Sequence, residues 1–383
     1  MTTGSMTTDF DIAICGAGPV GLALALLLAK RGVPAGRIAL IDAKTREQAA
    51  KDPRSIALSY GSRQILADIG AWPIAADPIH EIHVSRRGHF GRTMISRDDY
   101  ALPALGYVTR YGALVDALDS VARRTGAAVF RPAHLESAIE REERVDLTFS
   151  NGSQASAQIL VQAEGGVFSE QNAKARRHDY RQIAIVAHVK ASAPIAHRAF
   201  ERFTGEGPLA MLPQDDGYAL VWCMRPETAA RLSALDDTGF LAELQEVFGS
   251  RLGRFISVSQ RNAYPLGLNA GTSVSARMVA IGNAAQTLHP VAGQGLNLGL
   301  RDATVLARLL AQDLSPAALT RFTLDRKADR GLTIRLTDTM ARVFASAPDG
   351  ALSQSALGLS LGLIDAFAPA KRVLAEQMMF GWR

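Results

Sequence analysis

Two glycine-rich turns carry the residues of this 383-residue chain whose types and spacing suit nucleotide binding. The first reads Gly16-Ala17-Gly18-Pro19-Val20-Gly21, a GxGxxG pattern between a predicted strand over 10–15 and a predicted helix over 19–30. The first glycine permits a tight turn, the second lets the backbone approach a pyrophosphate, and the third lets helix and strand pack closely. The start of a helix also offers unpaired N–H groups and a partial positive charge to phosphates. The pattern predicts a dinucleotide site.

Asp42 strengthens this prediction, because it closes a second predicted strand over 37–41, 21 residues beyond Gly21. A carboxylate at that place can bind both hydroxyls of an adenosine ribose, and it repels a 2′-phosphate. The alternative, a glycine-rich turn used only for packing, leaves Asp42 unexplained. The pattern does not by itself distinguish NAD from FAD.

The second turn follows a short predicted strand over 277–281, which Gly282 and Asn283 close. A loop through Pro290 then leads to Gly293-Gln294-Gly295 and a predicted helix over 296–311. No acid follows this helix as Asp42 follows the first, so the turn suits a different part of the same ligand. An isoalloxazine ring gains negative charge at N1 and C2=O when it is reduced, and the start of a helix would stabilise that charge.

The segments between the two turns depart from a plain dinucleotide-binding domain, which continues in βαβ units of about thirty residues. Here a polar loop after Asp42 leads to a predicted helix over 60–69 and short alternating strands over 79–96. An amphipathic helix over 110–125 and a β-meander over 127–163 follow. The interruption of a nucleotide domain by strands indicates a flavin enzyme.

Composition narrows the class of protein. Apolar residues make up 48% and charged residues 21%, as in an ordinary globular chain of about two domains. The net charge is +5, and the basic doublets are scattered without interleaved aromatic residues, which argues against nucleic-acid binding. Two cysteines provide no disulfide framework and no metal pair. Residues 12–29 are uncharged but contain Gly-Ala-Gly-Pro, so we expect a buried strand, turn and helix there, in a cytoplasmic protein.

Several longer stretches resemble one family: "ICGAGPVGLALAL", "DPRSIALSYGSRQIL", "VTRYGALVDAL", "FERFTGEGPLAMLP" and "HPVAGQGLNLGLRDA". They are similar to the FAD-dependent aromatic-ring hydroxylases, the class A flavoprotein monooxygenases. Within that class they most resemble the ubiquinone-biosynthesis hydroxylases that act on 2-polyprenylphenols and 2-polyprenyl-6-methoxyphenols. The resemblance implies an α/β fold of the p-hydroxybenzoate hydroxylase type. In it a Rossmann-like FAD-binding domain (9–75, 100–182 and 270–345) is interleaved with a β-sheet substrate domain (76–99 and 183–269), and a helical segment (346–383) follows.

The resemblance also assigns roles to single residues. The implied cofactor-binding residues are Gly16, Ala17, Gly18, Pro19 and Gly21 at the pyrophosphate, Asp42 and Ala43 at the adenosine ribose, Arg54 and Arg110 at the flavin and its pyrophosphate, Glu164 and Gly165 in a middle motif, Gly282 and Asn283 at the ribityl chain, and Gly295, Leu296 and Asn297 at the pyrimidine edge. Beside the carbon that reacts with oxygen, the resemblance places the catalytic positions Pro290, Gly293 and Gln294.

Departures from the family pattern occur at three places. Asn283 stands where the family has aspartate, so a charge-assisted hydrogen bond becomes a neutral one, about 1 kcal/mol weaker. Gln286 stands where the family has histidine. The middle motif, Ala-Asp-Gly with a serine three residues on, reads Ala163-Glu164-Gly165 here, with one extra residue before Ser169. The mode of flavin reduction is therefore left open by the sequence.

The reaction implied is hydroxylation of an electron-rich phenol in ubiquinone biosynthesis. NADH or NADPH reduces FAD, O₂ adds to the flavin to give a hydroperoxide, and the ring attacks its distal oxygen. Three alternatives stay open: a flavin-free NAD-dependent reductase, a catalytically idle member that organises a ubiquinone-synthesis complex, and a hydroxylase of a different small phenol. No metal-binding or nucleophile motif is present in the sequence.

The substrate site is expected on the strands over 208–213 and 218–224. Met211, Pro213 and Trp222 are candidate pocket walls, with ordinary sheet core as the alternative for each. The chain end over 356–382 has apolar faces and Lys371-Arg372, so it either packs on the protein or lies on a membrane interface. The expected partners are a phenolic small molecule and O₂, with a peripheral contact to the membrane or to a ubiquinone-synthesis complex as a further option.

Overall fold

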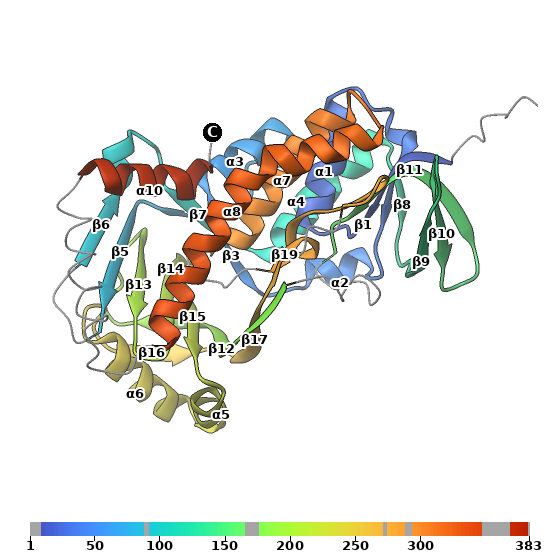
Figure 1. The fold of residues 1–383 in the computed structure, drawn as a ribbon. Helices are drawn as coiled ribbons and strands as arrows, with labels where there is room; N and C mark the ends of the chain where they lie inside the picture. Colours follow the sequence, from blue (N-terminus) through green and yellow to red (C-terminus); the bar gives the residue numbers. More distant parts are fainter. Residues whose placement is uncertain are drawn as a thin grey trace, which may run out of the picture.

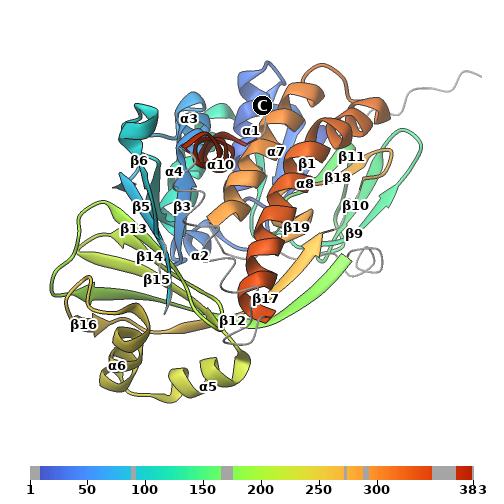
Figure 2. The same cartoon turned by 60° about the vertical axis from the view of Figure 1, so that its left-hand side comes forward.

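The computed structural model describes residues 9–87, 92–164, 176–270, 274–287, 293–346 and 368–381. These residues form a nucleotide-type α/β domain and a second, largely antiparallel sheet, with a long helix running between them (Figures 1 and 2). This arrangement agrees with the fold class that the family resemblance implies.

The first sheet holds the short apolar strands that the sequence places around the first glycine-rich turn. Its order is β8 (Ala128–Phe130), β2 (Ile38–Ile41), β1 (Phe10–Cys15), β11 (Gln154–Gln162), β10 (Val145–Phe149) and β9 (Leu135–Glu140), with β18 (Met278–Ala280) beside β11. The strands β8, β2, β1, β11 and β18 run parallel. All of β2 and the last four residues of β1 are buried, because both faces of a parallel sheet are covered.

Helices gather over one face of this sheet (Figure 1). They are α1 (Pro19–Lys30), α3 (Tyr60–Asp68), α4 (Tyr111–Thr125), α7 (Gln294–Leu310) and α8 (Pro316–Ser346), and a short α2 (Arg46–Ala50) lies at the end of β2. The first ten residues of α1 are all buried, which explains why the sequence carries no charge there. Helices α1 and α7, one from each glycine-rich turn, pack directly against each other.

The second sheet contains the segments that interrupt the nucleotide domain. Its order is β19 (Gln286–Thr287), β17 (Asn262–Ala270), β12 (Arg176–Ala191), β15 (Gly217–Met224), β14 (Pro208–Gln214), β13 (Arg198–Phe203), β5 (Glu81–Arg86) and β6 (Arg92–Ser96), with β16 (Phe255–Val258) beside β12. Helices α5 (Pro226–Ala234) and α6 (Asp237–Phe248) lie under one face, far from α1 and α7 (Figure 1).

The opposite face of this second sheet, which we call the inner face, turns toward the nucleotide domain. Ala199 of β13 and Leu212 of β14 pack there against Ile79 and Val108. These two residues belong to a small third sheet of β3 (Ser55–Ser59), β7 (Gly106–Arg110) and β4 (Asp77–Ile79).

Helices α8 and α10 complete the arrangement. Figure 2 shows α8 running from the nucleotide domain down beside β17 and β12, and α8 contacts β12. The last helix, α10 (Ala368–Phe380), lies across α3, where Tyr60 and Phe380 meet edge to face at 6.2 Å. In the part of the chain that the structure describes, no helix is long and apolar enough to cross a membrane.

Candidate functional site

The first glycine-rich turn has no room for side chains. A Cβ on Gly21 would lie 1.9 Å from the carbonyl oxygen of Gly16, and a Cβ on Gly16 would lie 2.7 Å from the backbone of Ala163. Gly16 also has a φ of +104°. Gly18 caps α1 without any side-chain hydrogen bond, and Pro19 occupies the first turn of the helix. The start of α1 is therefore bare backbone with open N–H groups, which fits the pyrophosphate of a dinucleotide.

Asp42 ties this turn to β2. Its Oδ2 accepts the N–H of Ala17 at 2.7 Å, and its Oδ1 accepts the N–H of Lys44 at 2.8 Å. Each carboxylate oxygen keeps a second lone pair, which can accept a ribose hydroxyl. Ala43 beside it is exposed. Asp42 thus serves the shape of the turn as well as the predicted ribose contact.

Glu164 brings a second carboxyl to the same place, from the chain that follows β11. Burial and the nearby Asp42 both raise the pKa of Glu164. Two acids flanking the turn make the site unfavourable for a 2′-phosphate, in agreement with FAD as the resident dinucleotide. Gly165, the next residue of the predicted motif, lies outside the described residues.

The second turn meets the first. Gly282 has a φ of +60°, and a Cβ there would lie 3.3 Å from the side chain of Val20 in α1. A Cβ on Gly299 of α7 would lie 2.7 Å from the same valine. A Cβ on Gly295 would lie 3.8 Å from Oδ1 of Asn283, which places this carboxamide beside the first turn of α7. Asn283 therefore stands between the starts of α1 and α7, where one ligand can run from one turn to the other.

The start of α7 is open, as the start of α1 is. Gly293 caps the helix with a φ of +59° and no side-chain hydrogen bond. Gln294 is buried, and Gly295 and Leu296 are partly buried. The first backbone N–H groups of α7 and the helix dipole suit the pyrimidine edge of a flavin. Pro290, predicted beside the reacting carbon, lies outside the described residues.

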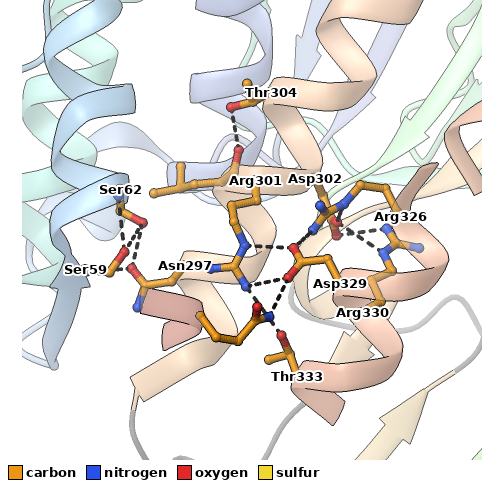
Figure 3. A network of polar contacts seen from close by, with 12 residues as sticks. Ser59, Ser62, Asn297, Arg301, Asp302, Thr304, Arg326, Asp329, Arg330 and Thr333 are labelled. Atoms are coloured by element: carbon orange, nitrogen blue, oxygen red, sulfur yellow. Dashed lines mark hydrogen bonds and ion pairs between the residues drawn. The ribbon is translucent and has the colours of Figure 1, made fainter. Parts of the chain in front are cut away.

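Asn297 has a role that the sequence did not indicate. Its Oδ1 accepts the N–H of Ser59 at 2.8 Å and the hydroxyl of Ser62 at 2.7 Å. Its Nδ2 donates to the carbonyl oxygens of Ala57 and Gly293 at 3.1 and 2.7 Å (Figure 3 shows the two serine contacts). The carboxamide thus accepts two and donates two hydrogen bonds within the protein. Only the backbone of Asn297 is then available to contact the cofactor.

The predicted arginines lie near the site but are held by acids. Arg54 donates to both oxygens of Asp52 and stacks on the ring of Tyr111 at 4.7 Å. A Cβ on Gly18 would lie 2.9 Å from the hydroxyl of Tyr111, so Arg54 approaches the first turn through this tyrosine. Sequence reasoning missed Tyr111, although it adjoins Arg110.

Arg110 instead joins the two domains. Its Nη2 lies 2.5 Å from Oδ2 of Asp215, at the tip between β14 and β15. The backbone N–H of Asp215 donates to Asp77, and Ser55 donates to Gln214 at 2.7 Å. These contacts fix the tip of the second sheet against the nucleotide domain.

The predicted substrate walls require a correction. Met211 and Trp222 are buried in the core under α6, with Trp222 6.0 Å from the ring of Phe240, and Pro213 shares the strand face of Met211. This face looks away from the nucleotide domain, so sheet core, the alternative that the sequence left open, describes these residues. Strand alternation separates two faces but does not say which one meets the cofactor domain.

Behind α7 lies a buried ion network that the sequence analysis did not identify. Asp302 is fully buried and accepts hydrogen bonds from Arg326 at 2.7 Å and from Arg330 at 2.8 Å (Figure 3). Burial alone would raise the pKa of Asp302, but the two arginines outweigh it and lower this pKa. Gln286, where the family has histidine, donates to Asp302 at 3.1 Å. Asp302 stands among apolar residues in the predicted helix over 296–311, and this position was the sequence signal for a buried charge.

A second ion pair extends this network toward the end of the chain. Arg301 donates to Asp329 at 2.9 Å, and Gln377 of α10 donates to the same aspartate at 3.3 Å. The network therefore anchors α7, whose start forms the second turn, to α8 and α10. Within the described ranges, no group of His, Cys, Asp and Glu side chains could hold a metal ion.

Comparison with known proteins agrees with this geometry. Residues 9–330 match the family model described as "FAD binding domain". The chain is 32% identical to the ubiquinone hydroxylase UbiL of Rhodospirillum rubrum, over 98% of this chain and 91% of that protein. It is 29% identical to the 3-demethoxyubiquinol 3-hydroxylase of Escherichia coli, over 83% and 86%. The crystal structure of p-nitrophenol 4-monooxygenase PnpA from Pseudomonas putida shares the fold, with a TM-score of 0.76 at 15% identity over 99% and 100%.

The fold and the paired glycine-rich turns define a flavoprotein of the aromatic-ring hydroxylase class, an FAD-dependent monooxygenase. The chain belongs to the ubiquinone-biosynthesis family of FAD-dependent hydroxylases. The predicted family, fold class, enzyme class and FAD cofactor are thereby confirmed, and a small molecule and O₂ are the reactants of such an enzyme.

Proposed function

We propose that this protein hydroxylates the aromatic ring of a polyprenylated phenol in ubiquinone biosynthesis, with NADH or NADPH as the electron donor. The observation that carries the proposal is the 32% identity to a ubiquinone hydroxylase along 98% of the chain. A likeness that spans both domains includes the substrate sheet as well as the cofactor turns.

The chain's own residues bind FAD and orient it. The bare starts of α1 and α7 hold the two ends of FAD, and Asn283 holds the ribityl chain between them. The N–H groups at Gly293 to Leu296 stabilise negative charge on the pyrimidine edge of the flavin. When bound, FAD supplies the transfer of one oxygen atom from O₂ to the ring. The catalytic positions remain Pro290, Gly293 and Gln294 in this proposal.

The inner face of the second sheet is the surface we assign to the phenol. It carries the partly accessible Ala210 and Val221, whereas the opposite face carries the buried Phe200, Met211 and Trp222. Small apolar side chains leave room for an aromatic ring and a prenyl chain between the sheet and the nucleotide domain.

We also infer a cytoplasmic protein that works peripherally at the inner face of the membrane, because a polyprenylated substrate resides in lipid. Helix α10 carries the exposed Val373 and Arg372 on its surface, which supports such a contact. Flotation with vesicles that contain anionic lipid tests this inference: the protein should float with them, and recovery only in the lipid-free fraction would contradict it.

Complementation of ubiquinone-hydroxylase-deficient cells, with the quinone intermediates analysed by mass, tests the proposed function. Restored ubiquinone, together with loss of one accumulated phenol that is a single oxygen atom lighter than its product, is the expected result. Unchanged intermediates in cells that contain the FAD-loaded protein would refute it.

A catalytically idle member with a scaffold role is the second candidate, and the neutral Asn283 at the ribityl position favours it. Anaerobic bleaching of the flavin by NADH or NADPH separates the two candidates. Bleaching followed by a hydroxylated product in air excludes the idle protein, whereas a flavin that neither donor reduces would support it.

A further inference from the structure

The side chain of Glu201, on β13, places a carboxyl group in an apolar part of the inner face. Glu201 lies two residues from Ala199, which packs against the nucleotide domain, so both side chains point to that side of the sheet. Its neighbours across the strands are Val84 of β5 and Ala210 of β14, and Val221 of β15 follows Ala210. None of these three neighbours carries a charge.

One oxygen of the Glu201 carboxyl group, Oε1, has no hydrogen-bond partner among the described residues. This oxygen is buried, although a buried ionised oxygen is costly without a hydrogen bond. Burial raises the pKa of Glu201 to about 7. Cys223 of β15 is close enough to Glu201 to interact with its charge. Burial, and to a smaller extent the charge of Glu201, raise the pKa of the Cys223 thiol, so this thiol is neutral. Arg86 of β5, two residues beyond Val84, lies on the same face and has an interaction of its own.

The side chains around Glu201 are not closely packed. Val84, Glu201, Ala210 and Val221 are all partly accessible, although they occupy the centre of a broad sheet between two domains. On the opposite face of the same strands, Phe200, Leu209, Leu220 and Trp222 are fully packed. A partly accessible apolar surface around one carboxyl with an unpaired oxygen is suited to an apolar ligand with a single hydrogen-bond donor.

We propose that Glu201 accepts the hydrogen bond of the substrate's phenol hydroxyl and takes its proton during ring hydroxylation. This inference rests on the proposed function and names the group that would recognise the phenol. As the O–H bond breaks, its electron pair moves into the ring and raises electron density at the carbon that forms the new C–O bond. The hydroxylated carbon then loses its own proton to restore aromaticity, and Glu201 returns a proton to the phenolate oxygen.

The overall reaction stays balanced with this step. The ring gains one oxygen atom of O₂, and the second oxygen leaves as water. NADH or NADPH supplies the two electrons, and one proton comes from solvent. Glu201 begins and ends each cycle in the same protonation state, so it acts as a base and then as an acid.

The experiment compares Glu201→Gln with the native protein, both loaded with FAD, on a 2-alkylphenol and on its O-methyl ether. For the native protein, kcat/KM with the phenol should fall as the pH drops through about 7, since the carboxyl must be ionised. Glu201→Gln should lose this limb of the pH profile and about a hundredfold in kcat/KM, while NAD(P)H oxidation becomes uncoupled from hydroxylation. The ether has no proton to give, so both proteins should oxidise it equally slowly.

Two further variants keep the test decisive. Glu246→Gln changes an exposed glutamate paired with Arg87 and should leave the rate and the pH profile unchanged. Glu201→Asp should retain the pH limb at a reduced rate. A Glu201→Gln protein with the native rate and pH profile would overturn the inference while the proposed function stands. Loss of FAD binding in both Glu201 variants would also overturn it, because Glu201 would then have a structural role. A native protein that reduces FAD but never hydroxylates the phenol would refute the proposed function itself.

Discussion

Replacing Asp302 with asparagine tests whether the buried ion network holds the second glycine-rich turn in place. The carboxylate is fully buried, and Arg326 and Arg330 beside it are also buried. Its oxygens accept from Arg326, from Arg330 and from Gln286 at 2.7 to 3.1 Å. Asparagine has the same shape, but its amide nitrogen can only donate, so it would face the guanidinium of Arg330 donor to donor.

The expected magnitude follows from the charge that remains. The network contains three arginines (301, 326 and 330) and two aspartates (302 and 329), a net charge of +1 that becomes +2 in the variant. Breaking a buried pair in this way costs about 3–5 kcal/mol, because an uncompensated charge stays buried. Since the arginines lower the pKa of Asp302, its contribution is complete above about pH 4, the unfolded value, and is lost as the pH falls through the lower folded value.

Urea unfolding at pH 7 measures this loss, and flavin fluorescence measures FAD affinity in the same samples. We expect a fall in stability of about 3–5 kcal/mol and weaker FAD binding, because α7 loses its anchor to α8. Asp325→Asn is the matched control: it changes an exposed aspartate of α8 that pairs with Arg308 and should cost less than about 1 kcal/mol. A loss below about 1 kcal/mol for Asp302→Asn would refute this reasoning.

Three other substitutions examine single parts of the site. Gly18→Ala should weaken FAD binding by about tenfold in a fluorescence titration, because its Cβ meets Tyr111 and occupies the approach of the pyrophosphate, whereas Gly36→Ala, with open space around it, should change nothing. Asn283→Asp should tighten FAD about fivefold, or about 1 kcal/mol, and an unchanged Kd would contradict our account of that position. Glu201→Gln should be more stable than the native protein by about 3 kcal/mol at pH 8 and no more stable at pH 4, because a pKa raised from 4.5 to about 7 penalises only the ionised carboxyl. Urea unfolding at both pH values measures these two stability differences. Equal differences at pH 8 and pH 4 would argue against a buried acid.

The glycine-rich turns were predictable from the sequence because local chemistry determines them. Gly16 and Gly21 meet neighbouring backbone wherever a strand, a tight turn and a helix pack closely, so their spacing alone identifies the turn. The start of α7 followed in the same way from Gly293 and the apolar spacing after it. What remained hidden was that both turns meet at Val20, since that contact joins residues far apart in the chain.

The substrate side was not predictable to the same degree. Met211 and Trp222 were correctly placed on strands, but the alternation of a strand does not reveal which face meets another domain. Asn297 was expected at the flavin, and only the fold shows that Ser59 and Ser62, far away in sequence, use its side chain. Glu201 stood in a quoted motif without attracting notice, because the lack of a partner for its Oε1 is a property of the folded sheet.

Oxygen labelling tests whether this protein transfers an oxygen atom of O₂ to a phenol. The purified protein, loaded with FAD and supplied with NADH or NADPH under ¹⁸O₂, is incubated with a 2-alkylphenol, and the product is analysed by mass spectrometry. We expect a hydroxylated phenol that carries a single ¹⁸O atom, with no label when ¹⁸O is supplied in water instead. An unlabelled product, or oxidation of the donor without any hydroxylated phenol, would contradict the proposed function.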